Sequence, residues 1–328
     1  MKRPRIFVTQ PIAKSATDRL RKLGSVKVFP DDSRIMPKPA LIKAVKQCDI
    51  LFCLLHDKID KDVVTANPKL RHIAAQSISP SNIDVAEATS RKIPVTVVPP
   101  VTTEATADLT LGLMLAVGRR VLEGDRMVRA GKFPGGQSRH LLGAYVWGKT
   151  IGLVGGGGLI GKAVARRAQG FGMRVLYWTP RRKPEAEERE AGLTFVELDD
   201  LLRQSDFVSL HAPLNAGTRH QIGKRELGLM KKTAFIINTA RGPIIDEAAM
   251  VRALKSKKIA GAGLDVFEFE PKVHPELKKM KNVVIVPHLG SATVEVREEM
   301  ANIVVDNIEA VLQGNRPPGI VNPEVLAS

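Results

Sequence analysis

The stretch "TIGLVGGGGLIGKAVARRAQGFGMRVLYW", residues 150–178, indicates the fold of much of the chain. A short apolar run is followed by glycines, and a helical apolar pattern that ends near Phe171 leads into a second apolar run. Gly156, Gly158 and Gly161 have the G-x-G-x-x-G spacing, which allows a tight turn, close approach of a pyrophosphate and close packing of helix on strand. The stretch therefore predicts a strand, turn and helix that bind a dinucleotide, with its phosphates over the helix N-terminus.

The alternation of strands and helices extends over most of the chain. Residues 5–98 and residues 150–287 contain short β-branched runs separated by helical patterns. Such alternation predicts an α/β fold with parallel sheets and helices on their faces. With 328 residues, the chain has about twice the usual length of one domain, so we expect two domains.

Two segments predict longer helices. Residues 104–130 read as one long helix with Leu109, Leu113 and Ala116 on one face. Its central part has few polar residues, so we expect burial on several sides, either in a core or between domains or subunits. A closing helical pattern covers residues 293–314, and we expect it to pack on the first domain.

The composition limits the classes of function. Cys48 and Cys53 are too few for a disulfide framework and have no partners at metal-ligand spacing, so we expect a cytoplasmic protein without a metal site. The N-terminal residues lack the apolar run of a secretory signal, and the longest apolar stretch, residues 109–117, is too short for a membrane span. The net charge of +16 is spread along the chain rather than gathered in a tail, which disfavours a nucleic-acid partner and favours small anions.

Three ionisable residues follow predicted strands. Arg241 lies in "IINTARG", Glu270 in "LDVFEFEP" and His288 in "IVPHLGSAT". In an open α/β sheet, ligands bind beyond the carboxyl ends of the strands. There an arginine can hold a carboxylate with two parallel hydrogen bonds, and a glutamate beside a histidine favours the charged, proton-donating ring. Taken singly, each residue also has an ordinary structural interpretation, as a surface charge, a loop acid or a hydrogen-bonded histidine.

The segment "YWTPRR", residues 177–182, indicates which dinucleotide binds. About twenty residues beyond the glycines, a dinucleotide site usually has an acid that holds the ribose 2′-hydroxyl. Thr179, Arg181 and Arg182 stand there instead, and they can bind a 2′-phosphate that an acid would repel. We therefore predict NADP(H), with NAD(H) possible if the arginines form only a solvated face beside the acidic run "PEAEERE".

The sequence resembles the D-isomer-specific 2-hydroxyacid dehydrogenases, most closely their glyoxylate and hydroxypyruvate reductase branch. The similarity covers nearly the whole chain and is dense from about residue 100 to residue 300. The resemblance implies two Rossmann-like domains, with a dinucleotide-binding domain at residues 101–289 inserted into a substrate domain of residues 1–100 and 290–328. It also implies a homodimer built largely through the long helix. The stretches that carry it are "GKTIGLVGGGGLIGKAVARRAQGFGMRVLY", "SDFVSLHAPLNAGTRHQI", "FIINTARGPIIDEAAMVRALKSKKIAGAGLDVFEFEP" and "NVVIVPHLGSATVEVREEM".

The resemblance assigns roles to the residues at the strand ends. It implies that Arg241 binds the substrate carboxylate and carbonyl, that His288 acts as general acid and base, and that Glu270 orients His288. Asp265 would hold the nicotinamide carboxamide. The other residues that it places along the cofactor are Gly156, Gly158, Leu159, Ile160, Thr179, Arg181, Arg182, Pro213, Thr218, Thr239 and Ala240.

In the first domain, the resemblance implies a substrate loop. The stretch "AAQSISPSNIDVAEA" matches a family loop whose backbone amides receive the substrate carboxylate. Ser77, Ile78 and Ser79 fall at its tip and would bind substrate together with Arg241 and His288. Leu54 ends a further strand that the family uses at its active site.

Two departures from the family pattern matter. The glycine turn has one residue more than usual between Val154 and Ile160, which leaves open which glycine contacts the phosphates. The substrate loop has Ser79 and Pro80 where the family commonly has Gly followed by an aromatic or polar residue. Because Pro80 has no N–H and a fixed φ, the identity of the preferred 2-oxo acid stays open.

These features predict reduction of a small 2-oxo acid, of the glyoxylate or hydroxypyruvate type, to the D-2-hydroxy acid by hydride transfer from NADPH. One alternative is an NAD-dependent D-2-hydroxyacid dehydrogenase that acts on another substrate. A second is a cofactor-sensing interaction protein, because the C-terminal-binding protein corepressors resemble the same family and a fold alone does not imply an activity. The compact length favours an enzyme.

Overall fold

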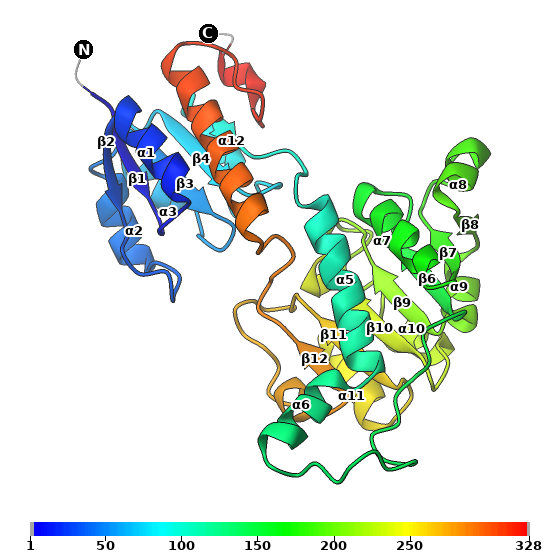
Figure 1. Cartoon of the computed structure of the whole chain (residues 1–328). Coiled ribbons are helices and arrows are strands. Elements are labelled where there is room, and N and C mark those ends of the chain that lie inside the picture. Colours follow the sequence, from blue (N-terminus) through cyan, green and yellow to red (C-terminus); the bar gives the residue numbers. More distant parts are fainter. Residues whose placement is uncertain (1–2, 327–328) are drawn as a thin grey trace. The chain divides into compact units, whose positions relative to one another are not determined.

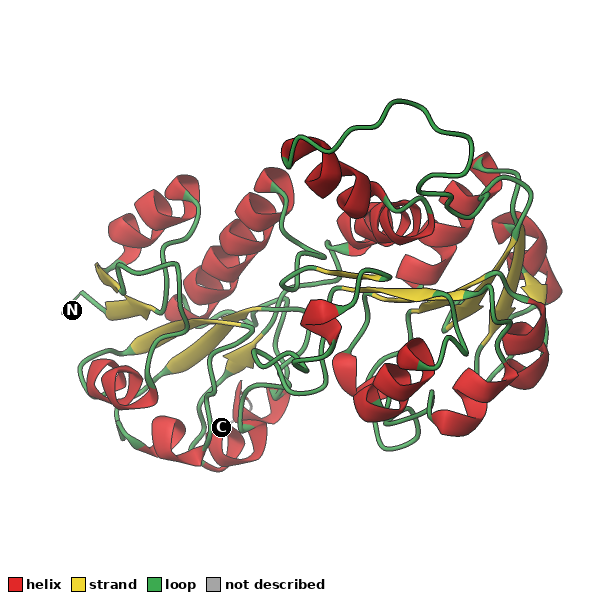
Figure 2. Cartoon of the chain, turned by 90° about the horizontal axis from the view of Figure 1, so that it is seen from below, coloured by secondary structure: helices red, strands yellow, loops and turns green. Residues whose placement is uncertain are grey.

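The computed structural model describes residues 3–326, which form two compact units (Figure 1). The terminal unit consists of the described residues up to Val101 and those from Thr293 onward, and the central unit consists of Thr102–Ala292. Each unit contains one parallel sheet with helices on both of its faces, as Figure 2 shows. The predicted α/β fold class is therefore confirmed.

The sheet of the terminal unit has the strand order β2-β1-β3-β4-β5. Neighbouring strands are parallel, so each connection crosses over through a helix. The strands are β1 (Arg5–Val8), β2 (Ser25–Val28), β3 (Ile50–Leu54), β4 (His72–Gln76) and β5 (Val95–Thr96). The helices are α1 (Lys14–Leu23), α2 (Lys38–Val45), α3 (Lys61–Thr65), α4 (Val85–Ser90) and α12 (Val294–Leu312), followed by a 3-10 turn (Pro323–Leu326).

The sheet of the central unit has the order β12-β11-β10-β9-β6-β7-β8, also with parallel neighbours. The strand order reverses between β6 and β9, which is where such sheets bind ligands. The strands are β6 (Thr150–Val154), β7 (Arg174–Trp178), β8 (Thr194–Phe195), β9 (Phe207–Leu210), β10 (Phe235–Asn238), β11 (Gly261–Leu264) and β12 (Val283–Ile285). The helices are α5 (Thr103–Gly118), α6 (Val121–Arg129), α7 (Leu159–Gly170), α8 (Glu185–Ala191), α9 (Leu198–Gln204), α10 (Lys224–Leu229) and α11 (Glu247–Lys255), with 3-10 turns at Gly242–Ile244 and Leu277–Lys279.

The closing helix α12 lies in the core of the terminal unit. Ile6 and Val8 of β1 pack with Leu20 of α1 and with Met300 and Val304 of α12. Because successive side chains of a strand point to opposite faces, a second cluster under α2 and α3 covers the other side of the sheet. The C-terminal helix thus completes a sheet whose strands all come from the first hundred residues.

The prediction of one helix over residues 104–130 was wrong. The structure contains two helices, α5 and α6, which are separated at Arg119 and Arg120. The backbone of Arg120 is left-handed, with φ of 56°, so the helical hydrogen-bond ladder cannot continue through it. α5 is buried on several sides within the central unit, as expected, and packs with α7 and the sheet. Neither α5 nor any other described helix is long and apolar enough to cross a membrane.

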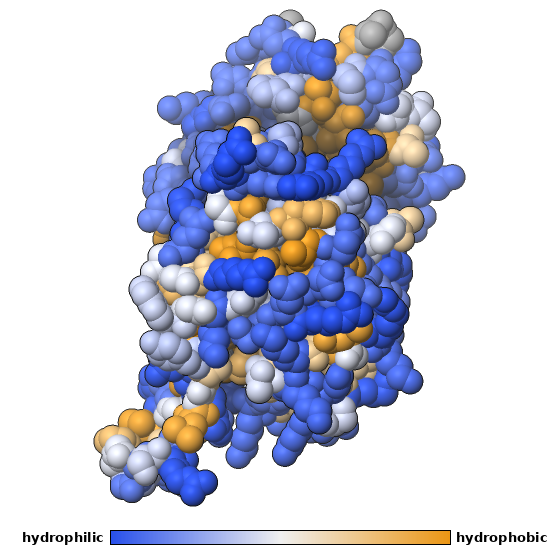
Figure 3. Space-filling model, turned by 90° about the vertical axis from the view of Figure 1, so that its right-hand side faces the viewer, coloured by the Kyte–Doolittle hydropathy of each residue, from blue (hydrophilic) through white to orange (hydrophobic). Residues whose placement is uncertain are grey.

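Residues 121–149, here called the arm, consist of α6 and the long loop that follows it (Figure 2). Many of its large apolar side chains are exposed, in contrast to those of α5. In Figure 3 the lowest projection of the surface, which corresponds to the loop below α6 in Figure 1, carries apolar patches. The exposed large apolar residues of the whole arm are Val121, Leu122, Val128, Phe133, Leu142, Tyr145 and Trp147.

Candidate active site

The glycine turn joins β6 to α7 with very close backbone packing. A Cβ on Gly161 would lie 2.5 Å from the Cα of Gly156, and a Cβ on Gly156 would lie 2.7 Å from the Cβ of Tyr177. Both positions therefore need glycine for contact between helix, turn and strand. Gly158 is the N-cap residue of α7 and has no side chain to occupy the space in front of the helix. These positions correspond to the three glycines of the predicted spacing.

The additional residue of the turn is accommodated by Gly155. Its φ is +84°, which favours glycine, and its amide donates to the carbonyl of Trp178 over 2.8 Å. A Cβ on Gly155 would lie 2.6 Å from the backbone nitrogen of Ala212, just after β9. The turn thus lies at the point where the strand order reverses, between β6 and β9.

The N-terminus of α7 fits a dinucleotide phosphate. No side chain caps it, so the first amides of the helix, at Leu159 and Ile160, point toward the turn without an intrahelical acceptor. The positive end of the helix dipole lies at the same place. Leu159 is 60% exposed, and Ile160 packs against the core beneath the turn.

Arg182, predicted to bind a 2′-phosphate, is already engaged in the structure. Its Nε and Nη2 donate to the two carboxylate oxygens of Glu188, each over 2.8 Å, and its guanidinium lies 5.6 Å from the Phe195 ring centroid. The Tyr177 hydroxyl donates to the same carboxylate over 2.6 Å. The guanidinium of Arg182 holds the pKa of Glu188 at about 2, with a smaller effect of Tyr177. Arg182 thus has a partner in the acidic run beside it, and its contact with a 2′-phosphate stays a prediction.

Thr179, Arg181 and Lys183 remain as groups that could contact the ribose. The Thr179 hydroxyl donates to the Arg181 carbonyl over 2.7 Å, which shapes the loop. The guanidinium of Arg181 is exposed and has no ion-pair partner within residues 3–326. The side chain of Lys183 lies against Gly157, where an added Cβ would meet its Cε at 2.9 Å. Lys183 was missed from the sequence because only folding brings it onto the glycine turn.

The loop after β9 contains two predicted cofactor residues, Pro213 and Thr218. The buried Thr218 hydroxyl donates to the Pro213 carbonyl over 2.6 Å and accepts from the amide of Asn215 over 2.9 Å. Pro213 is exposed. The buried Thr218 therefore fixes the shape of the loop, and Pro213 is the predicted cofactor residue of this loop that is exposed to solvent.

A tight turn after β10 presents Arg241. The Asn238 side chain accepts from the amide of Ala240 and donates to the carbonyl of Arg241, each over 3.0 Å. Gly242 is required because an added Cβ would lie 1.9 Å from the Phe267 carbonyl carbon. The Arg241 guanidinium donates to the Ala240 carbonyl over 2.7 Å, and burial lowers its pKa while Glu270 opposes that shift.

His288 and Glu270 form a hydrogen-bonded pair after β12 and β11. His288 Nδ1 lies 3.0 Å from Glu270 Oε2, and the other oxygen of Glu270 accepts from the amide of Phe267 over 2.9 Å. His288 has φ of +55°, an uncommon conformation for a residue with a side chain. Arg241, Glu270 and His288 thus follow the neighbouring strands β10, β11 and β12, as the sequence predicted.

Asp265 holds the backbone of the loop that carries His288. Its two carboxylate oxygens accept from the amides of Leu289 and Gly290, over 2.5 and 2.9 Å, and its own carbonyl accepts from the amide of His288. Asp265 is only 1% exposed, and burial raises its pKa. The structure therefore gives Asp265 a positioning contact in addition to the expected place beside the cofactor.

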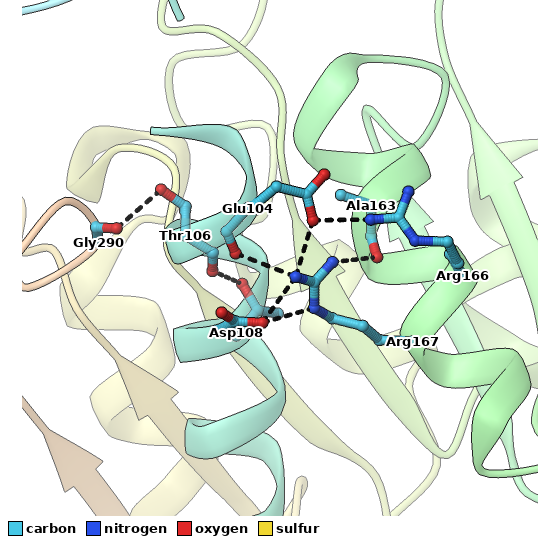
Figure 4. Close-up of polar contacts among 8 residues, drawn as sticks. Glu104, Thr106, Asp108, Ala163, Arg166, Arg167 and Gly290 are labelled. Atoms are coloured by element: carbon cyan, nitrogen blue, oxygen red, sulfur yellow. Dashed lines mark hydrogen bonds and ion pairs between the residues drawn. The ribbon is translucent and has the colours of Figure 1, made fainter. Parts of the chain in front are cut away.

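Two threonines of α5 also brace the site, and no sequence motif had indicated them. The Thr106 hydroxyl donates to the Gly290 carbonyl over 3.1 Å. The Thr110 hydroxyl donates to the Thr106 carbonyl and lies 2.8 Å from the hydroxyl of Thr239, which comes just before Arg241. Figure 4 shows the Thr106 contact beside the ion pairs that tie α5 to α7.

Those ion pairs join two acids of α5 to two arginines of α7 (Figure 4). Glu104 contacts Arg166 at 2.7 Å and Arg167 at 2.8 Å, and Asp108 contacts Arg167 at 2.7 Å. Arg167 also donates to the carbonyl of Ala163 over 3.0 Å. α5 therefore connects the helix after the glycine turn with the loops that carry Thr239 and Gly290.

In the terminal unit, the predicted substrate residues follow the neighbouring strands β3 and β4. Leu54 and Gln76 are register partners at the ends of these strands. The Ser77 hydroxyl donates to the Ser79 carbonyl over 2.7 Å, whereas the amides of Ile78 and Ser79 donate to no group within residues 3–326. The structure thus brings these residues to one strand edge and presents two amides there.

Asp57 and Asn82 hold this edge together. One oxygen of Asp57 accepts from the Leu54 amide over 2.7 Å and from the Thr9 hydroxyl, and Asn82 donates to the carbonyls of Leu54 and Asp57 over 3.0 and 2.8 Å. Asp57 is 3% exposed, and burial raises its pKa. A buried aspartate therefore braces a strand-end loop in each unit.

Comparisons with known proteins identify the family of the chain. A family model described as D-isomer specific 2-hydroxyacid dehydrogenase, NAD binding domain, matches residues 111–290. Glyoxylate reductase of Thermococcus litoralis is 46% identical over 330 residues, covering 99% of both chains. Glyoxylate reductase of Pyrococcus horikoshii is 48% identical over 328 residues, covering 99% of this chain and 97% of the relative.

Solved structures show the same similarity. The structure of a glyoxylate reductase from Paecilomyes thermophila has a TM-score of 0.83 and 33% identity, and the match covers 99% of this chain and 100% of that chain. Two others, each covering 97% of this chain and 99% of the other, contain cofactor: an acyclic imino acid reductase with NADPH (TM-score 0.82, 28% identity) and Aquifex aeolicus D-lactate dehydrogenase with NAD (TM-score 0.81, 27% identity). The chain therefore belongs to the D-isomer specific 2-hydroxyacid dehydrogenases and is an oxidoreductase that uses a nicotinamide cofactor.

Proposed function

We propose that the chain reversibly reduces a small 2-oxo acid, glyoxylate or hydroxypyruvate, to the D-2-hydroxy acid with NADPH. The observation that carries the proposal is the 3.0 Å contact between His288 Nδ1 and Glu270 Oε2, at the strand edge that also holds Arg241. A histidine whose ring is held in place by a carboxylate can transfer a proton to an oxygen that gains negative charge. The relatives named glyoxylate reductase support this substrate class.

Each catalytic side chain has a separate task in this proposal. Arg241 binds the substrate carboxylate and polarises the carbonyl, and its guanidinium stays charged despite burial. His288 gives a proton to the carbonyl oxygen in reduction and takes it back in oxidation, and Glu270 keeps the ring in place. A bound nicotinamide supplies or accepts the hydride, and Asp265 stands at the base of the same loop.

The preference for NADP(H) rests on the loop after β7. No acid occupies its first positions, Thr179 to Lys183, and Arg181 and Lys183 are two cations that can contact a 2′-phosphate. Arg182, which pairs with Glu188 in the structure, is a third cation of the same loop. NAD(H) is the alternative, since similar structures contain either cofactor.

The terminal unit supplies backbone donors for the substrate. We assign the amides of Ile78 and Ser79, which have no acceptor among the described residues, to the substrate carboxylate. Leu54 and Ser77 shape the same strand edge. Pro80 adds no donor to the loop, which fits a small 2-oxo acid that needs few contacts.

A homodimer is part of the proposal, with the arm as its interface. Phe133, Tyr145 and Trp147 are exposed by 67%, 67% and 59%, and large apolar side chains exposed along one segment are typical of protein interfaces. Size-exclusion chromatography with light scattering should give twice the chain mass. Phe133→Asp combined with Tyr145→Asp should give monomers, and a monomeric wild type would reject the dimer.

A cytoplasmic location completes the proposal. Cys48 and Cys53 are both free and buried, and burial raises the pKa of Cys48 to about 12. These thiols pack as small apolar side chains, which is usual for proteins of reducing compartments.

The activity test uses glyoxylate, hydroxypyruvate and 2-ketogluconate with NADPH and with NADH, following cofactor oxidation. We expect turnover of glyoxylate or hydroxypyruvate, faster with NADPH.

The test of His288 uses His288→Ala. This variant should lose about a hundredfold to ten-thousandfold in kcat, while cofactor binding, followed by fluorescence, persists. Full activity of His288→Ala would reject the assignment of His288 as the general acid. Cofactor-dependent capture of a protein partner without turnover of any 2-oxo acid would instead favour a sensor.

The cofactor test uses Thr179→Asp. A carboxylate at this position should repel a 2′-phosphate and accept from a 2′-hydroxyl, shifting the preference toward NADH. The readout is the ratio of kcat/KM with the two reduced cofactors. A wild-type ratio that favours NADH would contradict the proposed preference.

A further inference from the structure

Three runs of lysine precede three neighbouring strands of the central unit. "KK" at residues 231–232 comes before β10, "KSKK" at 255–258 before β11, and "KKMK" at 278–281 before β12. These strands are parallel and adjacent, with Phe235 paired to Gly261 and Ala262 paired to Val283. The runs therefore meet at the amino edge of the sheet, opposite the edge that carries Arg241, Glu270 and His288.

A pocket of about 560 Å³ lies among these runs. We call it the lysine pocket. Lys232, Lys255, Lys257 and Lys279 line it, together with Glu276 and Asn282. Its apolar lining comes from Leu254, Ile259 and Met280, of which the first two belong to the buried core of the central unit.

The charge in the lysine pocket is not balanced. Glu276 is the only acid that lines it, and it already pairs with Lys255 and, at 3.2 Å, with Lys279. Lys232 and Lys257 form no ion pair within residues 3–326. Four lysines against one glutamate leave three positive charges uncompensated, and like charges in one concave site repel each other and attract an anion.

Lys257 is held at the pocket by the end of α11. Its amide donates to the carbonyl of Leu254 over 3.2 Å, and the amide of Lys258 donates to Ala253 over 2.8 Å, which closes the helix. Lys257 has φ of +55°, where glycine or asparagine is usual. A cation thus occupies the position despite a backbone conformation that disfavours its side chain.

We propose that the lysine pocket binds a small phosphorylated molecule with two or more phosphate groups and an apolar or planar part, such as a nucleotide. The lysine ammonium groups would contact the phosphates, and Ile259 and Met280 would contact the apolar part. The pocket volume lies in the range that small-molecule sites occupy. This site is separate from the glycine turn, which lies at the other edge of the sheet.

The test is calorimetric binding of tripolyphosphate and of ATP to the full chain, with the glycine turn saturated by its reduced cofactor. Lys232→Glu combined with Lys257→Glu should weaken both ligands about tenfold or more. The control is Lys22→Glu combined with Lys69→Glu, which changes the net charge equally on exposed residues of the terminal unit. It should bind as the wild type does. Turnover should stay unchanged in both variants, because neither touches the catalytic edge.

A second variant avoids a folding defect. Lys257→Gly removes a charge and relieves the left-handed backbone, so it should keep or raise the melting temperature while weakening tripolyphosphate. ATP should bind more tightly than tripolyphosphate if the apolar lining takes part. Equal weakening in both double variants, no binding to the wild type, or binding of long polynucleotides only would each overturn the proposal.

Discussion

Two turns at the same edge of the central sheet carry arginines that the sequence predicted to bind anions, and they differ in what surrounds them. After β10, Arg241 donates only to the neighbouring Ala240 carbonyl and forms no ion pair within residues 3–326. After β7, Arg182 donates to both oxygens of Glu188. A guanidinium that already donates to both oxygens of a carboxylate in its own chain must give up that pair to bind a ligand, whereas Arg241 has no such pair to give up.

The bracing of the two turns also differs. The turn after β10 is fixed by Asn238, by Gly242 against Phe267, and by Thr110 through Thr239, so Arg241 stays in place without an ion pair. The loop after β7 is held by the ion pair of Arg182 with Glu188 and by the hydrogen bond from the Thr179 hydroxyl to the Arg181 carbonyl. We therefore propose that the same residue type binds a ligand in one turn and has a structural role in the other.

The largest expected effect is on turnover. Arg241→Ala should lower kcat/KM about a hundredfold to a thousandfold, because it removes the cation that stabilises negative charge on the substrate, whereas Arg182→Ala should keep most of it. The kcat/KM of Arg241→Lys should lie between those of Arg241→Ala and Arg182→Ala, since one ammonium replaces two parallel donors. Steady-state kinetics with glyoxylate or hydroxypyruvate measure the three variants. Equal losses of kcat/KM in Arg241→Ala and Arg182→Ala would show that the two arginines do not have different roles.

The next effect concerns the cofactor. Arg181→Ala should raise the KM for NADPH about tenfold, the usual loss for one charge-assisted hydrogen bond, with little change for NADH. Arg182→Ala is the matched control, because its guanidinium is committed to Glu188. If Arg182→Ala weakens NADPH more than Arg181→Ala does, then the ion pair opens when the cofactor binds.

A smaller effect is expected from the bracing of Arg241. Thr110→Val keeps the shape of the side chain but removes its contacts with Thr106 and Thr239, which should cost about 1 kcal/mol of unfolding free energy. Thr110→Ser keeps the hydroxyl and should restore both stability and kcat. Chemical denaturation and kinetics test the pair. If Thr110→Val retains wild-type kcat and stability, α5 does not brace the turn.

The smallest effect is on acid stability. The pKa of Glu188 is lowered from 4.5 to about 2 in the folded chain, so its stabilisation is complete above pH 4.5 and is lost as the pH falls toward 2. Glu188→Gln should therefore show a smaller fall of melting temperature over this pH range than the wild type. Glu185→Gln, which removes an exposed acid of the same helix, is the control. Identical pH profiles of wild type and Glu188→Gln would show that the pair adds no stability.

Local sequence patterns were sufficient for the fold class and for the meeting of Arg241, Glu270 and His288 at one sheet edge, whereas the catalytic roles of these residues stay predictions. Apolar runs of strand length that alternate with helical patterns lead to parallel sheets, and residues that follow neighbouring parallel strands necessarily meet at one edge. The sequence alone therefore predicted that Arg241, Glu270 and His288 lie close together. Local patterns did not predict the end of the long helix at Arg120. The apolar periodicity does not indicate that the backbone of this residue is left-handed.

The order of the elements, the glycine turn and the set of ionisable groups at the strand ends are thus readable in the linear chain. Which of those groups are already paired depends on how the chain packs. Packing joined Arg182 to Glu188, laid Lys183 on Gly157, and placed Thr106 and Thr110 of α5 under the active-site loops. The physical reason is that backbone periodicity depends on near neighbours, whereas the partner of a charge or hydroxyl depends on side chains from other elements that arrive only when the chain packs.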